Sequence, residues 1–281
     1  MSEDTNSKET KHFTRDFGPL LERKQQELVR RKQDQPLETM FHKVQRNTTD
    51  LKLAASKCGG LGIILDWNPA IHPEVETVLP RNFPEQANKI LAVSTPTDKL
   101  HLKGSADNLT KISENDLCLP TLQHDLIIDP YQIYHSRYYG AHYISLFPGT
   151  ISDNDLLTLF LLSRQHGMAP IMHVSNSKEL DKAMNTPVQF LCLSETDYFG
   201  NKLDIEEIRD IVEEIPQERM VICKLDDWSP EKIEILWDAE INFCWVQYPE
   251  STRNLNRLMS IISSYDECKD ETDEENGSTQ N

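Results

Sequence analysis

The chain has 281 residues, of which 38% are hydrophobic, and it carries a formal net charge of −17. This length suits one large domain or two small ones, and the acidic excess argues against a nucleic-acid backbone or an anionic membrane as partner. The last 17 residues hold seven acidic residues and one lysine, so −6 of the charge belongs to the tail. Such a tail is commonly a solubility aid, with recruitment of a partner as the alternative.

The six cysteines indicate a reducing compartment, because none is spaced as Cys-x-x-Cys and several lie inside apolar runs. The polar N-terminus, "MSEDTNSKETKHF", has no apolar signal core, and no segment is long enough to span a bilayer. We therefore expect a cytoplasmic protein. Core packing is expected for Cys192, Cys223 and Cys244, since only Lys224 adjoins one of them and its side chain points to the opposite face of the strand.

Residues 17–265 are predicted to form a single domain. It lies between segments at 1–16 and 266–281 that are predicted to be disordered, because both are rich in charge and poor in apolar residues. The domain is expected to open with a helix over about 18–33, ahead of the main fold.

In this first helix, Leu21, Leu28 and Val29 share one face, and Glu27 faces Arg31 one turn later. Its basic stretch, "RKQQELVRRK", is expected to be a solvated face, with attraction of an anion as the alternative.

Eight short apolar runs alternate with helical patterns through the rest of the domain. Ser152 and Ser229 are predicted helix N-caps, and two helices are predicted to end at Gly140 and Gly167. Eight alternating units predict a (β/α)8 barrel, or TIM barrel, and a doubly wound sheet is the alternative. The runs span residues 60–67, 90–95, 117–125, 143–148, 170–175, 190–195, 220–227 and 243–248.

The stretch "HDLIIDPYQIYHSRYYGAHYISL", residues 124–146, resembles indole-3-glycerol phosphate synthase of tryptophan biosynthesis. That family reads Lys-Asp followed by Phe-Ile-Ile-Asp-x-Tyr-Gln-Ile-Tyr, and the eight residues Ile127 to Tyr134 fit the pattern. "LERKQQELVRRK" resembles the family's extra N-terminal helix. The resemblance covers about residues 18–262. It implies a TIM barrel whose active site lies at the C-terminal ends of the strands.

The family's carboxy-lyase reaction closes an indole ring with loss of carbon dioxide and water. It needs a cationic proton donor, a carboxylate base and donors that hold a phosphate. The resemblance puts His124 in place of the lysine that acts as general acid and His173 in place of a glutamate. The family's functional positions are thereby assigned to Ile63, Leu65, His124, His173, Ser194 and Leu225.

The expected phosphate site is also altered. Asp226 stands where the family has a glycine, Asp227 follows it, and Pro249 removes a backbone donor from the last loop. Two like charges about 4 Å apart repel by roughly 4 kcal/mol at an effective dielectric of 20. We therefore expect a protein that has the family's barrel fold, has lost its reaction and binds a protein partner or a small molecule.

Two alternatives stay open. The chain is an active synthase if strand 1 and the phosphate loops are misaligned, or an enzyme of changed chemistry that uses His124 and His173. These histidines, with Asp66 and Asp226, could hold a divalent metal or form an acid–base pair. We favour the interpretation that they are polar residues that fill the space and bond to their neighbours. No metal or cofactor is assigned. The candidate pocket residues are Asp66, Asn68, His124, His173, Ser194, Asp226 and Gln247.

Aromatic residues follow the third predicted strand. The helical spacing of Tyr131, Tyr134 and Tyr138 predicts that they pack against the barrel, and a partner surface is the alternative.

Overall fold

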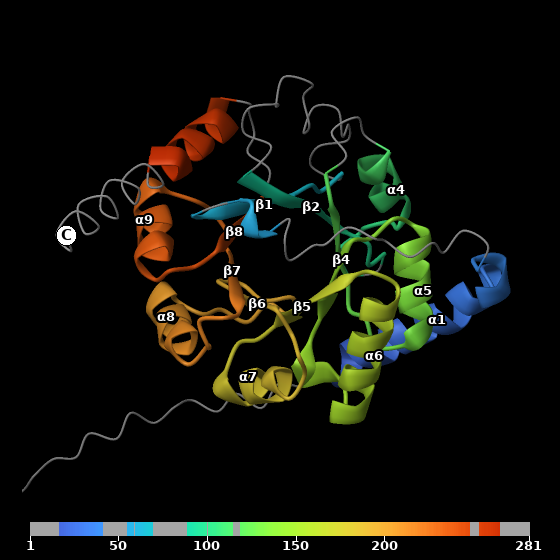
Figure 1. Ribbon diagram of the computed structural model, residues 1–281. Coiled ribbons are helices and arrows are strands. Elements are labelled where there is room, and N and C mark those ends of the chain that lie inside the picture. The colour runs from blue at the N-terminus through green and yellow to red at the C-terminus, as the bar shows by residue number, and fades with distance from the viewer. Residues whose placement is uncertain are drawn as a thin grey trace, which may run out of the picture.

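The computed structural model describes residues 17–41, 55–58, 60–69, 89–99, 101–114, 119–247 and 253–264, so the predicted disordered ends lie outside the described residues. Eight parallel strands pair in sequence order and close into a barrel, which confirms the predicted (β/α)8 fold (Figure 1). The strands are β1 (Gly62–Asp66), β2 (Ile90–Pro96), β3 (Thr121–His124), β4 (Tyr143–Leu146), β5 (Ala169–His173), β6 (Phe190–Ser194), β7 (Met220–Lys224) and β8 (Phe243–Gln247).

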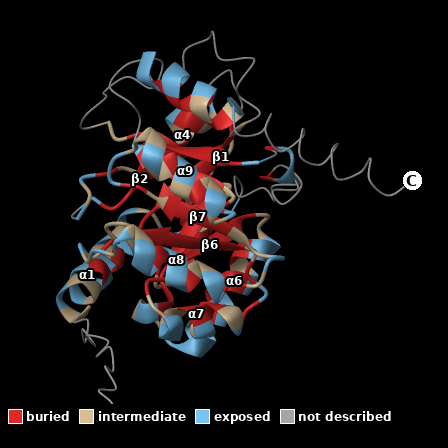
Figure 2. Ribbon diagram, turned by 90° about the vertical axis from the view of Figure 1, so that its left-hand side faces the viewer, coloured by how far each residue is buried: buried red, intermediate tan, exposed pale blue. Residues whose placement is uncertain are grey.

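The helices surround the barrel, and α1 lies at one end of it, as the two ribbon views together show (Figures 1 and 2). They are α1 (Gly18–Asp34), α4 (Asp107–Ser113), α5 (Pro130–Tyr138), α6 (Asp153–Gln165), α7 (Ser177–Met184), α8 (Ile205–Glu213), α9 (Pro230–Asp238) and a last helix over 253–264, with short 3-10 turns at Leu37–Thr39 and Pro148–Thr150.

Local signals explain where these helices begin and end. The hydroxyls of Ser152 and Ser229 accept N–H bonds as the N-caps of α6 and α9. Asp129 and Gln132 form a capping box at the start of α5. After α5 and α6 the chain passes through Gly140 and Gly167 at φ of 97° and 73°, a region that glycine enters without strain.

The strands are buried (Figure 2), and side-chain alternation divides the core into two layers. Ile63, Leu65, Val93 and Cys223 belong to the layer between strands and helices. The barrel interior is filled by the other set of strand residues: Ile64, Leu122, Tyr143, Ile171, Phe190, Cys192, Ile222, Phe243 and Trp245. Asp66, two residues after Ile64, and Lys224, two after Ile222, therefore face the interior at the C-terminal end of the barrel.

The cysteines pack in both layers. Cys192 lies inside the barrel, whereas Cys223 and Cys244 lie beneath the helices. Burial raises the pKa of Cys192 and of Cys244 to about 12 and that of Cys223 well above its usual value. These thiols are therefore protonated at neutral pH and unsuited to nucleophilic chemistry.

The tyrosines of α5 pack differently from the prediction. Tyr131, Tyr134 and Tyr138 form a cluster with Leu28 of α1 and with Met40, rather than with the barrel. The reason is that α1 and the turn after it cover the outer face of α5, which the sequence pattern of α5 alone does not reveal.

Candidate functional site

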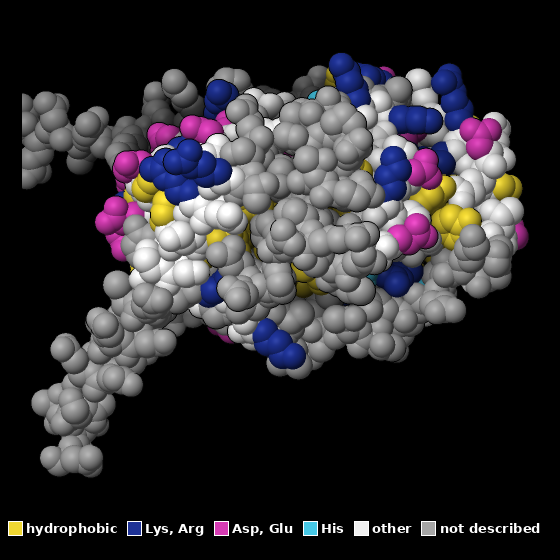
Figure 3. Space-filling view, turned by 90° about the horizontal axis from the view of Figure 1, so that it is seen from above, with side chains coloured by type: hydrophobic (Ala, Val, Ile, Leu, Met, Phe, Trp, Pro, Cys, Tyr) yellow, Lys and Arg dark blue, Asp and Glu magenta, His cyan; other side chains and the backbone are white. Residues whose placement is uncertain are grey.

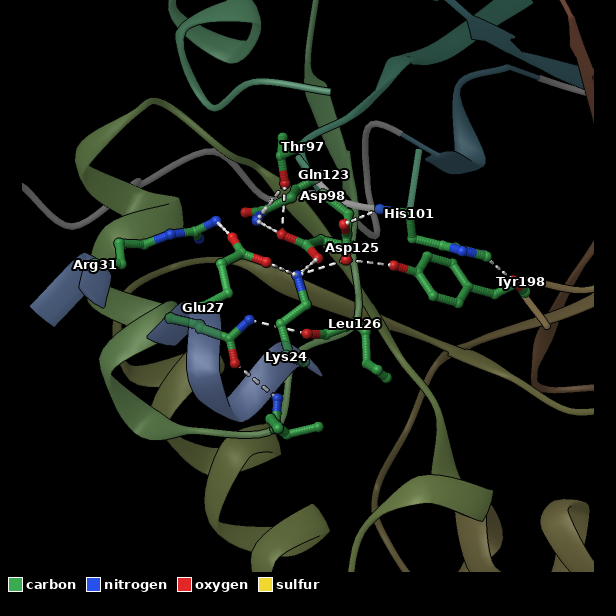
Figure 4. Close-up of polar contacts among 12 residues, drawn as sticks. Lys24, Glu27, Arg31, Thr97, Asp98, His101, Gln123, Asp125, Leu126 and Tyr198 are labelled. Carbon is green, nitrogen blue, oxygen red and sulfur yellow. Dashed lines mark hydrogen bonds and ion pairs between the residues drawn. The ribbon is translucent and has the colours of Figure 1, made fainter. Parts of the chain in front are cut away.

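A buried lysine, Lys24, is among the residues that join helix α1 to the barrel. Only 2% of Lys24 is exposed, and its Nζ lies 2.6 Å from Asp98 Oδ2, 2.6 Å from Asp125 Oδ1 and 3.1 Å from Glu27 Oε2 (Figure 4). Burial alone would lower the pKa of Lys24, but Asp125, Asp98 and Glu27 together raise it above its usual value. The expectation of a solvated face is therefore wrong for Lys24, because carboxylates after β2 and β3 surround its ammonium group.

The carboxylates around Lys24 are held in turn by neighbouring groups. Tyr198 Oη donates to Asp98 and Thr97 Oγ1 donates to Asp125, each at 2.8 Å. Burial opposes the charge of Asp98, yet Lys24, the His101 N–H and the Tyr198 hydroxyl together lower the pKa of Asp98 to about 2. The network links α1 to the ends of β2 and β3 and to the loop after β6, so it fixes one side of the barrel mouth (Figure 4).

Aromatic rings fill the centre of the mouth. His124 and His173 stack with ring centroids 5.9 Å apart and an interplanar angle of 12°. Phe147 also stacks on His173 at 4.6 Å, and Trp245 meets both imidazoles edge-on at 5.0 and 5.7 Å. The cavity that the described residues leave beside His173 and Ser194 measures about 10 Å³, which is room for about one water molecule.

Both histidines are neutral at physiological pH. Burial, with Lys224 acting in the same direction, lowers the pKa of His173 to about 3 and that of His124 well below 6.5. His173 Nε2 lies 2.9 Å from Ser145 Oγ. Because His124 stays uncharged at neutral pH, it is a poor substitute for a cationic proton donor.

A lysine and a carboxylate, Lys224 and Asp66, also face the interior at the mouth. β1 and β7 flank β8, and Lys224 Nζ lies 5.7 Å from the Trp245 ring centroid. Burial raises the pKa of Asp66, although the charge of Lys224 opposes this. Asp66 Oδ1, Ser94 Oγ and Trp245 Nε1 are buried without a well-formed hydrogen bond. Strand alternation was the signal that could have identified Lys224 as inward-facing.

The loop between β7 and α9 is occupied by its own acidic side chains. The Asp226 N–H donates to Glu195 Oε2 at 2.9 Å, and Thr196 Oγ1 donates to Asp226 Oδ2 at 2.6 Å. Lys232 Nζ lies 2.8 Å from Glu195 Oε1 and 2.7 Å from Asp227 Oδ1. Lys232 thus binds two carboxylates, and the Asp226 amide is already bonded to Glu195 of the loop after β6.

A comparison with known families now decides the relationship. The family model for indole-3-glycerol phosphate synthase matches residues 19–236. The chain belongs to this family.

Relatives named indole-3-glycerol phosphate synthase include one from Dehalococcoides mccartyi (strain CBDB1), 36% identical over 139 residues, or 49% of this chain and 54% of that protein. One from Acetivibrio thermocellus is 32% identical over 54% of this chain and 58% of its own length. One from Delftia acidovorans is 25% identical over 68% and 74%. The chain therefore spans little more than half the length of the first two relatives.

Solved structures resemble the chain in fold alone. Thiamine phosphate pyrophosphorylase from Pyrococcus furiosus superposes with a TM-score of 0.53 at 14% identity, covering 74% of this chain and 98% of that one. A mandelate oxidase variant gives 0.52 at 10% identity, covering 85% and 90%.

Three residues that the resemblance put at functional positions of this family do not reach the mouth. Ile63, Leu65 and Leu225 pack in the outer layer beneath the helices, since the strands alternate and an irregularity in the β1–β2 pairing falls between Ile63 and Ile64. At the C-terminal ends of β1 and β7, the inward positions are those of Asp66 and Lys224.

The remaining candidates spread over the mouth and its rim. His124, His173 and Ser194 are buried at the strand ends, and Asn68 is half-buried after β1. Asp226 and Gln247 are exposed. Pro249 lies outside the described residues. Among the residues that the structure describes, no three His, Cys, Asp or Glu side chains gather as a metal site, and no helix is long and apolar enough to cross a membrane.

Proposed function

We propose that this member of the family has lost the ring-closing reaction and acts as a binding or interaction protein. The observation that carries this proposal is the acidic cluster at the start of α9, in which Glu195 and Asp227 bind Lys232 and Glu195 also accepts the Asp226 N–H. A phosphate needs free backbone N–H groups and positive charge. Each carboxylate about 4 Å from a phosphate would instead repel it by roughly 4 kcal/mol per pair of unit charges at an effective dielectric of 20.

The loss of a cationic acid supports the same proposal. The strand-3 lysine of the family is charged at neutral pH, whereas burial keeps His124 neutral here. The stack of His124, His173 and Phe147 also fills the centre of the barrel mouth, where the resemblance places the family's active site. Lys224 supplies an amine, but from β7 rather than β3.

The test is an assay of purified protein with the family's substrate, beside the Dehalococcoides mccartyi relative as positive control. We expect no indole product above the uncatalysed background. Turnover by this chain that His124→Ala abolishes would contradict the proposal.

A second candidate is an enzyme of changed chemistry, favoured by the convergence of Asp66 and Lys224 beside the two histidines. A buried carboxyl group with a raised pKa next to an amine can move protons during a reaction. A screen of small metabolites for turnover tests it, with Lys224→Met as the variant and Lys111→Met, an exposed lysine of α4, as the control. Equal turnover in both variants would rule out this role for Lys224.

A further inference from the structure

A cavity of about 540 Å³ lies outside the barrel mouth, between α1, the start of α4 and α5. One wall is a stripe of α1 side chains spaced three or four residues apart, and Lys99 and Ser105–Asp107 form the opposite wall. His135 and Tyr139 of α5 also line it. We call this cavity the α1 cleft. Its volume is in the range of pockets that hold metabolites and cofactors, roughly 300–1,000 Å³.

The buried polar group of the cleft is a histidine without a hydrogen-bond partner among the described residues. His135 is 4% exposed, and its ring is flanked by those of Tyr131 and Tyr139, with centroids 5.8 and 4.7 Å away. No hydrogen bond or ion pair within the described ranges involves its ring nitrogens. The ring nitrogens are not among the fully buried polar atoms that lack a partner, so they remain open to the cleft and can bond water or a ligand there.

The charged residues that line the cleft leave a small cationic excess, because Arg23, Arg30, Arg31 and Lys99 line it with Glu27, Asp34 and Asp107. Burial lowers the pKa of His135 to about 3, and the charges of Arg31 and Lys24 act in the same direction. Glu27 binds both of these cations, and Asp98 and Asp125 neutralise Lys24 further. Arg30 and Lys99 add two exposed cations at the rim.

We propose that the α1 cleft binds a small organic oxyanion, a carboxylate- or phosphate-bearing metabolite. Its anionic group lies against the basic face of α1, and its polar body bonds the neutral imidazole of His135. Tyr139 offers a ring face to the remainder of the ligand, and the cavity is much larger than an inorganic ion requires. This site lies apart from the barrel mouth, so the test of ligand binding here is independent of the test of the proposed loss of ring closure.

Isothermal titration calorimetry of the full chain tests the proposal with three probes: citrate, ribose 5-phosphate and inorganic phosphate. We expect at least one of the first two to bind more tightly than inorganic phosphate. Citrate alone identifies a carboxylate ligand, and ribose 5-phosphate alone a phosphate ligand. The double variant Arg30→Ala, Lys99→Ala should weaken binding roughly tenfold or more, because two charged contacts are lost. Lys32→Ala is the matched control, since Lys32 lies on α1 outside the cleft and pairs with Asp129.

Two outcomes would overturn the proposal. One is the absence of binding for every probe at about 10 mM. The other is binding that the double variant and Lys32→Ala weaken equally, which would show a diffuse charge effect. As a second readout, the imidazole NMR signals of His135 should shift on titration in the wild type, and their constancy at saturation would also count against the site.

Discussion

At the scale of single residues, Lys24 carries the attachment of α1. Its ammonium group is buried among three carboxylates, two of them at 2.6 Å. A buried ion pair contributes little relative to a well-packed apolar substitute for both partners, but removal of one partner leaves the other charge buried and unpaired.

Lys24→Met should therefore lower the free energy of unfolding by about 3–5 kcal/mol. Lys32→Met, which removes an exposed pair with Asp129, should cost about 1 kcal/mol or less. Urea unfolding of both variants measures the difference. Equal losses would show that Lys24 is not the main attachment of α1.

His173 makes stability depend on pH. Its folded pKa of about 3 lies below the unfolded value near 6.5, so between these values the unfolded chain binds a proton that the folded chain does not. The contribution of neutral His173 to the free energy of unfolding is therefore complete above pH 6.5, and it is lost as the pH falls toward 3.

In His173→Gln, the slope of unfolding free energy against pH between pH 4 and 6 should fall by up to about 1.4 kcal/mol per pH unit. Chemical unfolding across this range measures it. His124, His135 and His142 have lowered pKa values too, so part of the slope should persist. A slope identical to wild type would contradict this account of His173.

At the scale of elements, residue patterns predicted where strands and helices lie, because alternation, caps and glycines act over a few residues. The predicted runs overlap all eight strands, and Ser152 and Ser229 cap as expected. The patterns did not predict which strand residues face inward at β1 and β7. They also missed the burial of Lys24, since its partner Asp125 is 101 residues away in sequence.

The start of α5 offers a test at this scale, because Asp129 both caps the helix and pairs with Lys32. Asp129→Ala should lower the free energy of unfolding by about 0.5–2 kcal/mol. Asp129→Asn keeps a side-chain acceptor for the cap and loses only the exposed ion pair. The free energy of unfolding should therefore fall by less than in Asp129→Ala. Thermal or urea unfolding ranks the two, and a larger loss in Asp129→Asn would mean that the ion pair matters more than the cap.

At the scale of the whole molecule, the described strands close the family's barrel, and our proposal is that the chemistry at its mouth has changed. On the face in Figure 3, Lys and Arg side chains lie among Asp and Glu side chains. From the sequence, the site could be predicted only as a set of positions whose residues differ from those that the resemblance implies for the family. The Asp66–Lys224 convergence and the Glu195–Lys232 network needed the closed barrel, which brings residues of different strands and loops together.

Complementation of a tryptophan auxotroph that lacks indole-3-glycerol phosphate synthase tests the central claim most directly. We expect no growth without tryptophan when this chain is expressed in soluble form, while the Dehalococcoides mccartyi relative restores growth. Growth supported by this chain, and lost on His124→Ala, would contradict the account.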